Sequence, residues 1–299
     1  MLQEYNGELA ALATAIFWTI TALAFESASL KVGSLSVNII RLVIGFIFLT
    51  IFVSIRRGMI LPFDASVGNW TWLTISGLVG FVFGDLFLFK SYTIIGSRFS
   101  MLIMTLVPPI TALLGFFILS EKLTLLNYFG MMLTFSGIAM AIFSKGKNDK
   151  LSLKLSPRGI LFAFAGALGQ ATGLVLSKLG MNTYDPFAST QIRIISGMVG
   201  FIVIVTLMGK WAKVREALNN RKGMTGIITG SFFGPFLGVS FSLLAVKYTE
   251  TGIAATIMSL VPILIIPPVY FIYKQKVTII EIFGAIVSVI GVSLFFIRY

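Results

Sequence analysis

Four charged side chains stand inside or beside long apolar runs of this sequence, where they could do chemistry. Two are carboxylates, Glu26 in "ALAFESAS" and Asp85 in "GFVFGDLFLFK", and two are arginines, Arg41 in "RLVIG" and Arg193 in "RIISG". A carboxyl group withdrawn from water can bind and release a proton near neutral pH. An arginine in similar surroundings can hold a carboxylate through two parallel hydrogen bonds. These residue types therefore predict proton exchange and anion binding.

Three of these residues also have a purely structural interpretation. Glu26 and Arg41 flank one short loop, so they can form an ion pair or reach water from helix ends. Asp85 is the deepest carboxylate in its run. It is either an ion-pair partner, with Arg41 as one choice, or a site for a coupling proton or a cation. The sequence leaves these alternatives open.

A second group of polar residues predicts a binding site for a small molecule. Arg193 and Gln191 could hold a substrate carboxylate, unless Arg193 only anchors a helix end. Trp18, Thr21 and Gln170 stand near the middle of their apolar runs. An amide without a partner is costly there, so Gln170 either contacts a ligand or bonds to a neighbouring carbonyl within tight helix packing.

Several kinds of chemistry are missing from the sequence. It contains no cysteine and no histidine, which excludes disulfides, thiol nucleophiles, histidine-ligated haem or zinc, and Ser-His-Asp triads. It has no G-x-x-x-x-G-K-[ST] loop, which excludes ATP-driven transport within the chain. We expect a protein that is not an enzyme and that has no cofactor and no metal.

The composition determines where the polar residues must lie. Of the 299 residues, 57% are hydrophobic and only 11% are charged, whereas a soluble domain has about 25% charged residues. The sequence predicts an all-α integral membrane protein, because a helix satisfies its own backbone hydrogen bonds in lipid. The net charge of +12 fits loop residues that contact lipid headgroups, and we expect no binding of nucleic acid.

A helix needs about 20 residues to cross the hydrocarbon core of a membrane. Ten stretches of that kind are predicted as spans. They cover residues 8–28, 36–55, 69–90, 98–119, 124–144, 158–180, 188–208, 224–246, 252–273 and 278–297.

The two halves of the chain repeat one another. The segment 105–124, "TLVPPITALLGFFILSEKLT", returns at 259–278 as "SLVPILIIPPVYFIYKQKVT". This pairs Pro108 with Pro262, an offset of 262 − 108 = 154. Prolines at equivalent positions predict a kink in each half, which suits two gates that bend alternately and equally suits two static bends.

The repeat also predicts the topology. Five spans per half is an odd number, so the second half must cross the membrane in the opposite direction. The sequence thus predicts two five-helix inverted-topology repeats, 1–144 and 158–299, joined by a polar linker at 145–157. In this plan the two bundles are related by an axis in the membrane plane, and the substrate lies between them near Trp18 and Gln170. Lys and Arg are about twice as numerous in the loops on the linker side, which predicts both termini outside.

The order of these features resembles the EamA-type branch of the drug/metabolite transporter superfamily. The resemblance rests on "IFWTITAL" in the first span, on "SEKLT" before the fifth span and on the repeat, and it covers nearly the whole chain. It implies secondary transport of small metabolites, amino acids or drugs, often as export, and both termini in the cytoplasm. The second half departs from the family's acidic turn, because Gln275 stands where Glu121 does.

The residues and the resemblance together predict a multi-pass secondary transporter of the plasma membrane that works by alternating access. Proton coupling would require Glu26 or Asp85 to titrate, whereas uniport or exchange would require neither. A channel-like facilitator or a scaffold that transports nothing is the alternative. The expected partners are a small-molecule substrate and the lipid bilayer, and the chain is either a monomer or a homodimer.

Overall fold

The computed structural model describes residues 5–143, 156–268 and 278–296, and these ranges contain helices and no strand. The predicted linker at 145–157 falls mostly outside them, as does Gln275. The first half contains α1 (Asn6–Val32), α2 (Ser34–Arg57), α3 (Val67–Gly77), the π-helical η2 (Leu78–Gly84), α4 (Asp85–Met104), α5 (Val107–Leu119) and α6 (Leu125–Phe143). The second half contains α7 (Pro157–Met181), α8 (Pro186–Leu207), α9 (Trp211–Asn219), α10 (Arg221–Ser231), the π-helical η4 (Phe232–Gly238), α11 (Val239–Tyr248), α12 (Thr251–Met258), α13 (Val261–Leu264), α15 (Ile279–Ser293) and the short η5 (Leu294–Phe296).

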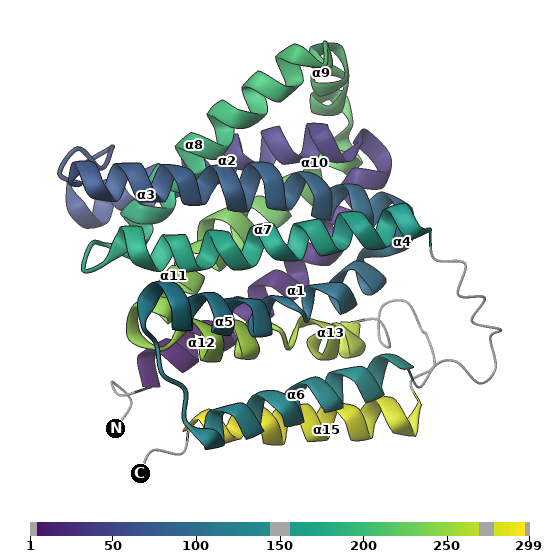
Figure 1. Ribbon diagram of the computed structural model, residues 1–299. Coiled ribbons are helices and arrows are strands. Elements are labelled where there is room, and N and C mark those ends of the chain that lie inside the picture. Colours follow the sequence, from purple (N-terminus) through teal and green to yellow (C-terminus); the bar gives the residue numbers. More distant parts are fainter. Residues whose placement is uncertain (1–4, 144–155, 269–277, 297–299) are drawn as a thin grey trace.

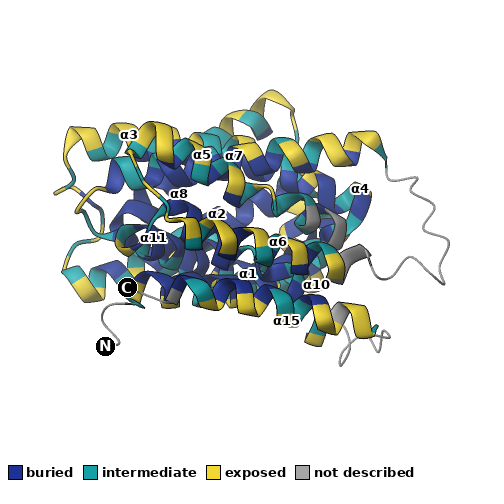
Figure 2. Cartoon of the chain, turned by 60° about the horizontal axis from the view of Figure 1, so that its bottom comes forward, coloured by how far each residue is buried: buried dark blue, intermediate teal, exposed yellow. Residues whose placement is uncertain are grey.

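The helices have the length and surface of a multi-pass membrane protein. Seven helical stretches among the described residues are long and apolar enough to cross a membrane, and three shorter apolar helices accompany them. The helices run in roughly one direction across the view of Figure 1. Large apolar side chains such as Leu125 and Phe117 point outward and are 87% and 72% exposed, and exposed residues follow the outer helices in Figure 2. Such a surface suits lipid, because lipid tails are as apolar as these side chains.

Two predicted spans are broken at equivalent places. Residues 105–106 separate α4 from α5, and residues 259–260, displaced by the same 154 positions, separate α12 from α13. Pro108 and Pro262 follow these breaks in the first turns of α5 and α13. The prolines therefore begin new helices instead of bending continuous ones, since the first turn of a helix has no internal bond for proline to remove.

The two halves interlock instead of forming two separate bundles. α7 of the second half packs along α3, η2 and α4, while α1 of the first half packs along α10, η4 and α11. Close approach depends on glycine: a Cβ on Gly173 would lie 2.8 Å from Cα of Gly80, and one on Gly234 would lie 2.8 Å from Cγ2 of Thr21. Small residues permit this contact between helix backbones in membranes. α6 and α15 pack against each other in the same way and lie side by side at the bottom of Figure 1.

A short helix occupies the basic stretch 209–223, which lies between the predicted spans 188–208 and 224–246 and is not itself a predicted helix. α9 buries Val214 and Ala217 and exposes Lys213 and Arg215. Asn220 then caps α10 by accepting the backbone N–H of Gly223 at 2.8 Å. The sequence pattern that indicates this helix is only two small apolar residues long. The many Lys and Arg residues around it make the pattern hard to recognise.

An ion-pair cluster ties two loops together at the end of the molecule where α1 begins. Tyr184 donates its hydroxyl to Asp64 at 2.7 Å and receives a hydrogen bond from Arg57 at 3.2 Å. Burial tends to raise the pKa of Asp64, but hydrogen bonds from Tyr184 and Arg57 outweigh it, and the pKa lies below its usual value. Burial raises the pKa of Tyr184 to about 12. The cluster holds the loop after α2 against the loop between α7 and α8.

Candidate functional site

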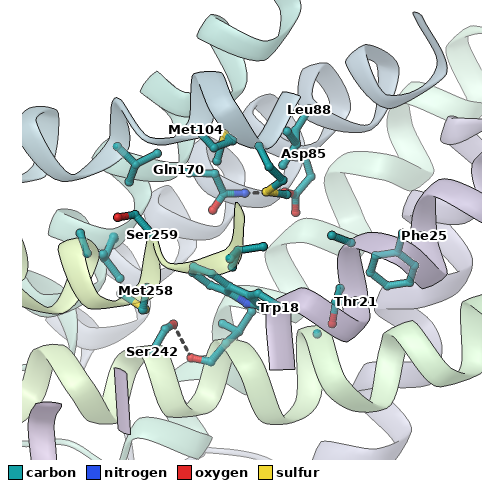
Figure 3. Close-up of a pocket in the computed structure, with 18 of the residues that line it drawn as sticks. Trp18, Thr21, Phe25, Asp85, Leu88, Met104, Gln170, Ser242, Met258 and Ser259 are labelled. Atoms are coloured by element: carbon teal, nitrogen blue, oxygen red, sulfur yellow. Dashed lines mark hydrogen bonds between the residues drawn. The ribbon is translucent and has the colours of Figure 1, made fainter. Parts of the chain in front are cut away.

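A cavity of about 120 Å³ lies where helices of both halves meet (Figure 3). Both helix breaks line it, with Pro108 near one and Ser259 and Pro262 near the other. Most of the wall is apolar or aromatic, and Trp18 and Phe25 of α1 contribute to it. Among the residues that line it, four have charged or amide side chains. These are Arg41, Asp85, Gln170 and Arg193.

Asp85 is the centre of a hydrogen-bond network. It directly follows the π turn η2, it is 4% exposed, and its two carboxylate oxygens accept separate hydrogen bonds from Arg41 and Gln170. Arg41 also donates Nε to Asn38 at 3.1 Å, and Asn38 donates to the backbone oxygen of Asp85 at 3.3 Å. This geometry fits the ion-pair interpretation of Asp85, because both oxygens are already occupied.

Arg193 is buried without such a network. It is 4% exposed, and its Nε has no hydrogen-bond partner among the residues that the structure describes. Its guanidinium makes a cation–π contact with Phe81, at 4.9 Å from the ring centre. Its counterpart in the repeat is Arg41, because "RLVIG" and "RIISG" match at an offset of 193 − 41 = 152. Arg41 pairs with a carboxylate, whereas Arg193 makes no ion pair with any described residue.

The cavity collects four of the five residues predicted to bind substrate. Trp18, Thr21, Gln170 and Arg193 all line it. Gln191 does not, because its amide donates to Thr50 at 3.0 Å and to the backbone oxygen of Ile60 at 2.7 Å.

Glu26 is not among the residues that line the cavity, and it does not serve as the partner of Arg41. It accepts hydrogen bonds from the backbone N–H of Ser97 at 3.1 Å and from its hydroxyl at 2.6 Å. Lys178, which the repeat aligns with Glu26 (26 + 152 = 178), donates to Glu121 at 2.6 Å. These two contacts lie outside the cavity.

Sequence reasoning missed Asn38, although a signal was present. Asn38 is a polar residue in the apolar run of α2, three positions before Arg41, and side chains three apart on a helix are neighbours. Within the described ranges, no group of three or more His, Cys, Asp or Glu is placed to hold a metal ion.

Comparisons with known proteins agree with this architecture. The model of the EamA-like transporter family matches residues 5–143 and again 157–297. An uncharacterized transporter of Clostridium kluyveri is 28% identical over 143 residues, which cover 46% of this chain and 44% of that protein. The uncharacterized transporter YyaM of Bacillus subtilis is 24% identical over 224 residues, which cover 73% of this chain and 70% of that protein. The match to the Clostridium protein thus spans less than half of its length.

A solved structure has the same fold. It is titled "Crystal structure of protein", it superposes with a TM-score of 0.70 at 15% sequence identity, and the match covers 96% of this chain and 94% of that chain. The resemblance read from the sequence is confirmed, because the family model matches both halves and the relatives are transporters by name. This chain is a membrane transporter, and it belongs to the EamA-like transporter family.

Proposed function

We propose that the chain is a secondary transporter that carries a small organic solute with a carboxylate group through the cavity by alternating access. The proposal includes ten spans in two inverted five-helix repeats, 1–144 and 158–299, in the plasma membrane. In this proposal the remaining spans are the three shorter apolar helices that accompany the seven long stretches. Export is the direction that the family resemblance favours.

The guanidinium of Arg193, which is buried and lacks a hydrogen-bond partner at Nε among the described residues, is the observation that carries the substrate class. A buried donor without a hydrogen-bond partner is unfavourable, and Nε of Arg193 has none among the described residues although the side chain lines the cavity. Asp85 attracts Arg193 electrostatically, but its two oxygens accept hydrogen bonds from Arg41 and Gln170. A substrate carboxylate would supply both the opposite charge and two acceptor oxygens in the geometry of the fork. Asp85 cannot attract a cation in the same way, because Arg41 and Gln170 already occupy its oxygens.

The cavity limits the size and polarity of the rest of the substrate. Its volume of about 120 Å³ is close to that of an engineered apolar cavity, about 150 Å³, that binds benzene. Trp18, Phe25 and Phe89 line it. The substrate therefore has an apolar part no larger than about one ring, with Trp18, Thr21 and Gln170 as its contacts beside the carboxylate at Arg193.

A matched pair of ligands tests this proposal. Benzoate and phenylacetate should raise the melting temperature of the purified protein, because a ligand of the native state stabilises it. Their amides have the same shape and no charge, and they should not. Arg193→Gln should weaken carboxylate binding at least tenfold, since a hydrogen bond to a charged group contributes about 1.5–3 kcal/mol.

The controls decide between this site and non-specific binding. Arg56→Gln changes an arginine that pairs with Asp185 outside the cavity, and it should bind the carboxylates as the unmodified chain does. In proteoliposomes, preloaded carboxylate should accelerate uptake of labelled carboxylate, which a channel-like facilitator would not show. Equal stabilisation by acid and amide, or unchanged affinity in Arg193→Gln, would remove the carboxylate from the proposal.

A further inference from the structure

Two carboxylates on different elements make the same contact in the two halves. Glu26 accepts the backbone N–H and the hydroxyl of Ser97 at 3.1 and 2.6 Å. Glu121 accepts the backbone N–H and the hydroxyl of Thr251 at 2.9 and 2.6 Å. Ser97 and Thr251 are equivalent in the repeat, because 97 + 154 = 251.

Both contacted residues begin a helical segment. Gly96 has a left-handed backbone with φ 78°, so the helix restarts at Ser97. Thr251 is the first residue of α12, and the preceding Glu250 makes no capping bond with its side chain. The first N–H groups of a helix lack partners, and a carboxylate is favourable there. Glu26 and Glu121 therefore act as caps supplied from other elements.

Each capped segment forms an arm that ends at the cavity. Residues 97–104 run from Ser97 to the break at 105–106, and α12 runs over eight residues to the break at 259–260. Met104 and Met258, the last residues of the two arms, both line the cavity. Displacement of an arm would therefore open the cavity at that arm's end.

The two caps lie at opposite ends of the molecule. Glu8, near the start of α1, contacts the hydroxyl of Thr249 at 3.4 Å, two residues from Thr251. Glu26 lies 26 − 8 = 18 residues further along the same helix. At 1.5 Å per residue this is about 27 Å, which is close to the ~30 Å hydrocarbon core of a bilayer. Each face of the membrane thus has one cap.

The cap at Glu121 is built with an additional cation. Lys178 donates to Glu121 at 2.6 Å and to the backbone oxygen of Thr249 at 2.8 Å. Gly115 provides the room, since a Cβ there would lie 2.6 Å from both Oε2 of Glu121 and Oγ1 of Thr251. Glu26 and Lys178 have opposite charges at equivalent positions, but both stabilise the start of an arm. Glu26 contacts Ser97 directly, and Lys178 acts through Glu121 and Thr249.

We propose that these contacts are the two latches of alternating access. Release of the Glu26–Ser97 latch opens the cavity to the face where α1 ends, and release of the Glu121–Thr251 latch opens it to the face where α1 begins. The inference rests on the proposed transport function. Both latches are closed in this structure.

The absence of cysteine from the chain permits a direct test. Ser259→Cys places a single thiol in the cavity wall, and a membrane-impermeant maleimide is added to one side of sealed vesicles. Glu26→Ala in this background should increase the labelling rate about tenfold from the face where α1 ends and leave the rate from the other face unchanged. Glu121→Ala should give the reverse pattern. Tenfold corresponds to about 1.4 kcal/mol, slightly less than one hydrogen bond to a charged group contributes.

Two controls test whether the labelling is specific to the latches and which face each latch controls. Glu216→Ala removes an exposed carboxylate on α9 and should change neither rate. In a separate variant, Lys213→Cys on the exposed face of α9 reports which side of the membrane carries α9. The next helix, α10, packs through Gly223 against Val32 at the end of α1. Equal labelling of both latch variants from one face, or no change in either, would overturn the latches.

Two further measurements keep the result decisive. If an alanine variant fails to fold, Ser97→Ala and Thr251→Val remove one hydroxyl from each latch and should give the same face-specific pattern with smaller factors. A flat pattern in both overturns the proposal. The labelling needs no substrate, so face-specific labelling without carboxylate transport rejects only the substrate, and transport with flat labelling rejects only the latches.

Discussion

Asp85 and Arg41 illustrate how much depends on single residues in this cavity. We expect Asp85→Asn to lower the free energy of unfolding by about 3–5 kcal/mol, because Arg41 would become a buried charge without a partner. The double variant Arg41→Met with Asp85→Asn should recover most of that loss. Thermal and denaturant unfolding in detergent measure both. If Asp85 instead carries a coupling proton, Asp85→Asn keeps its stability and loses uptake driven by a pH gradient.

For single residues, the sequence predicts which side chains line the cavity better than it predicts which residues they contact. Trp18, Thr21, Gln170 and Arg193 were predicted to lie together and all line the cavity, since polar groups deep in apolar runs must be satisfied somewhere. Gln191 was grouped with Arg193 and lies elsewhere. Residues two apart on a helix point to different sides, so proximity in sequence was misleading there.

The helices approach each other most closely at glycines. A Cβ on Gly169 of α7 would lie 2.6 Å from Cα of Gly84. We expect Gly169→Ala to destabilise the protein by about 1–3 kcal/mol, since the helices must separate. Gly68→Ala is the matched control in the exposed first turn of α3, where the nearest atom would be 3.7 Å away; it should be neutral or stabilising by up to about 1 kcal/mol. Melting curves in one detergent compare the two, and equal losses would contradict the close approach.

The apolar runs predict where helices lie but not where they break. The predicted span 98–119 consists of the end of α4, a break and α5, and hydropathy is blind to this because broken and continuous helices are equally apolar. The prolines marked the right positions, since Pro108 and Pro262 stand just after the breaks. Hydropathy also misses helix α9, because its buried apolar face consists of only two residues, Val214 and Ala217.

Because the two halves interlock, we expect each half to depend on the other for folding. α1 has its main partners in α10, η4 and α11, and α7 has its own in α3, η2 and α4. We expect a chain divided after residue 150 to yield two fragments that co-purify and together bind ligand. Either fragment alone should aggregate, because its glycine-lined faces have no partner. A first fragment that stays monodisperse and melts cooperatively alone would show that the halves are independent.

The two halves share one departure from regular α-helix, a π turn. η2 and η4 occupy equivalent positions, since 78 + 154 = 232 and 84 + 154 = 238. A π turn holds an extra residue, and one residue rotates a helix by about 100°. Deletion of one residue from η2 would therefore swing Asp85 about a quarter turn away from Arg41. The residues after the two turns, Asp85 and Val239, both line the cavity and differ in charge, while the turns themselves are the same. The extra residue in each half thus turns the same wall position toward the cavity, where one half carries a carboxylate and the other a valine.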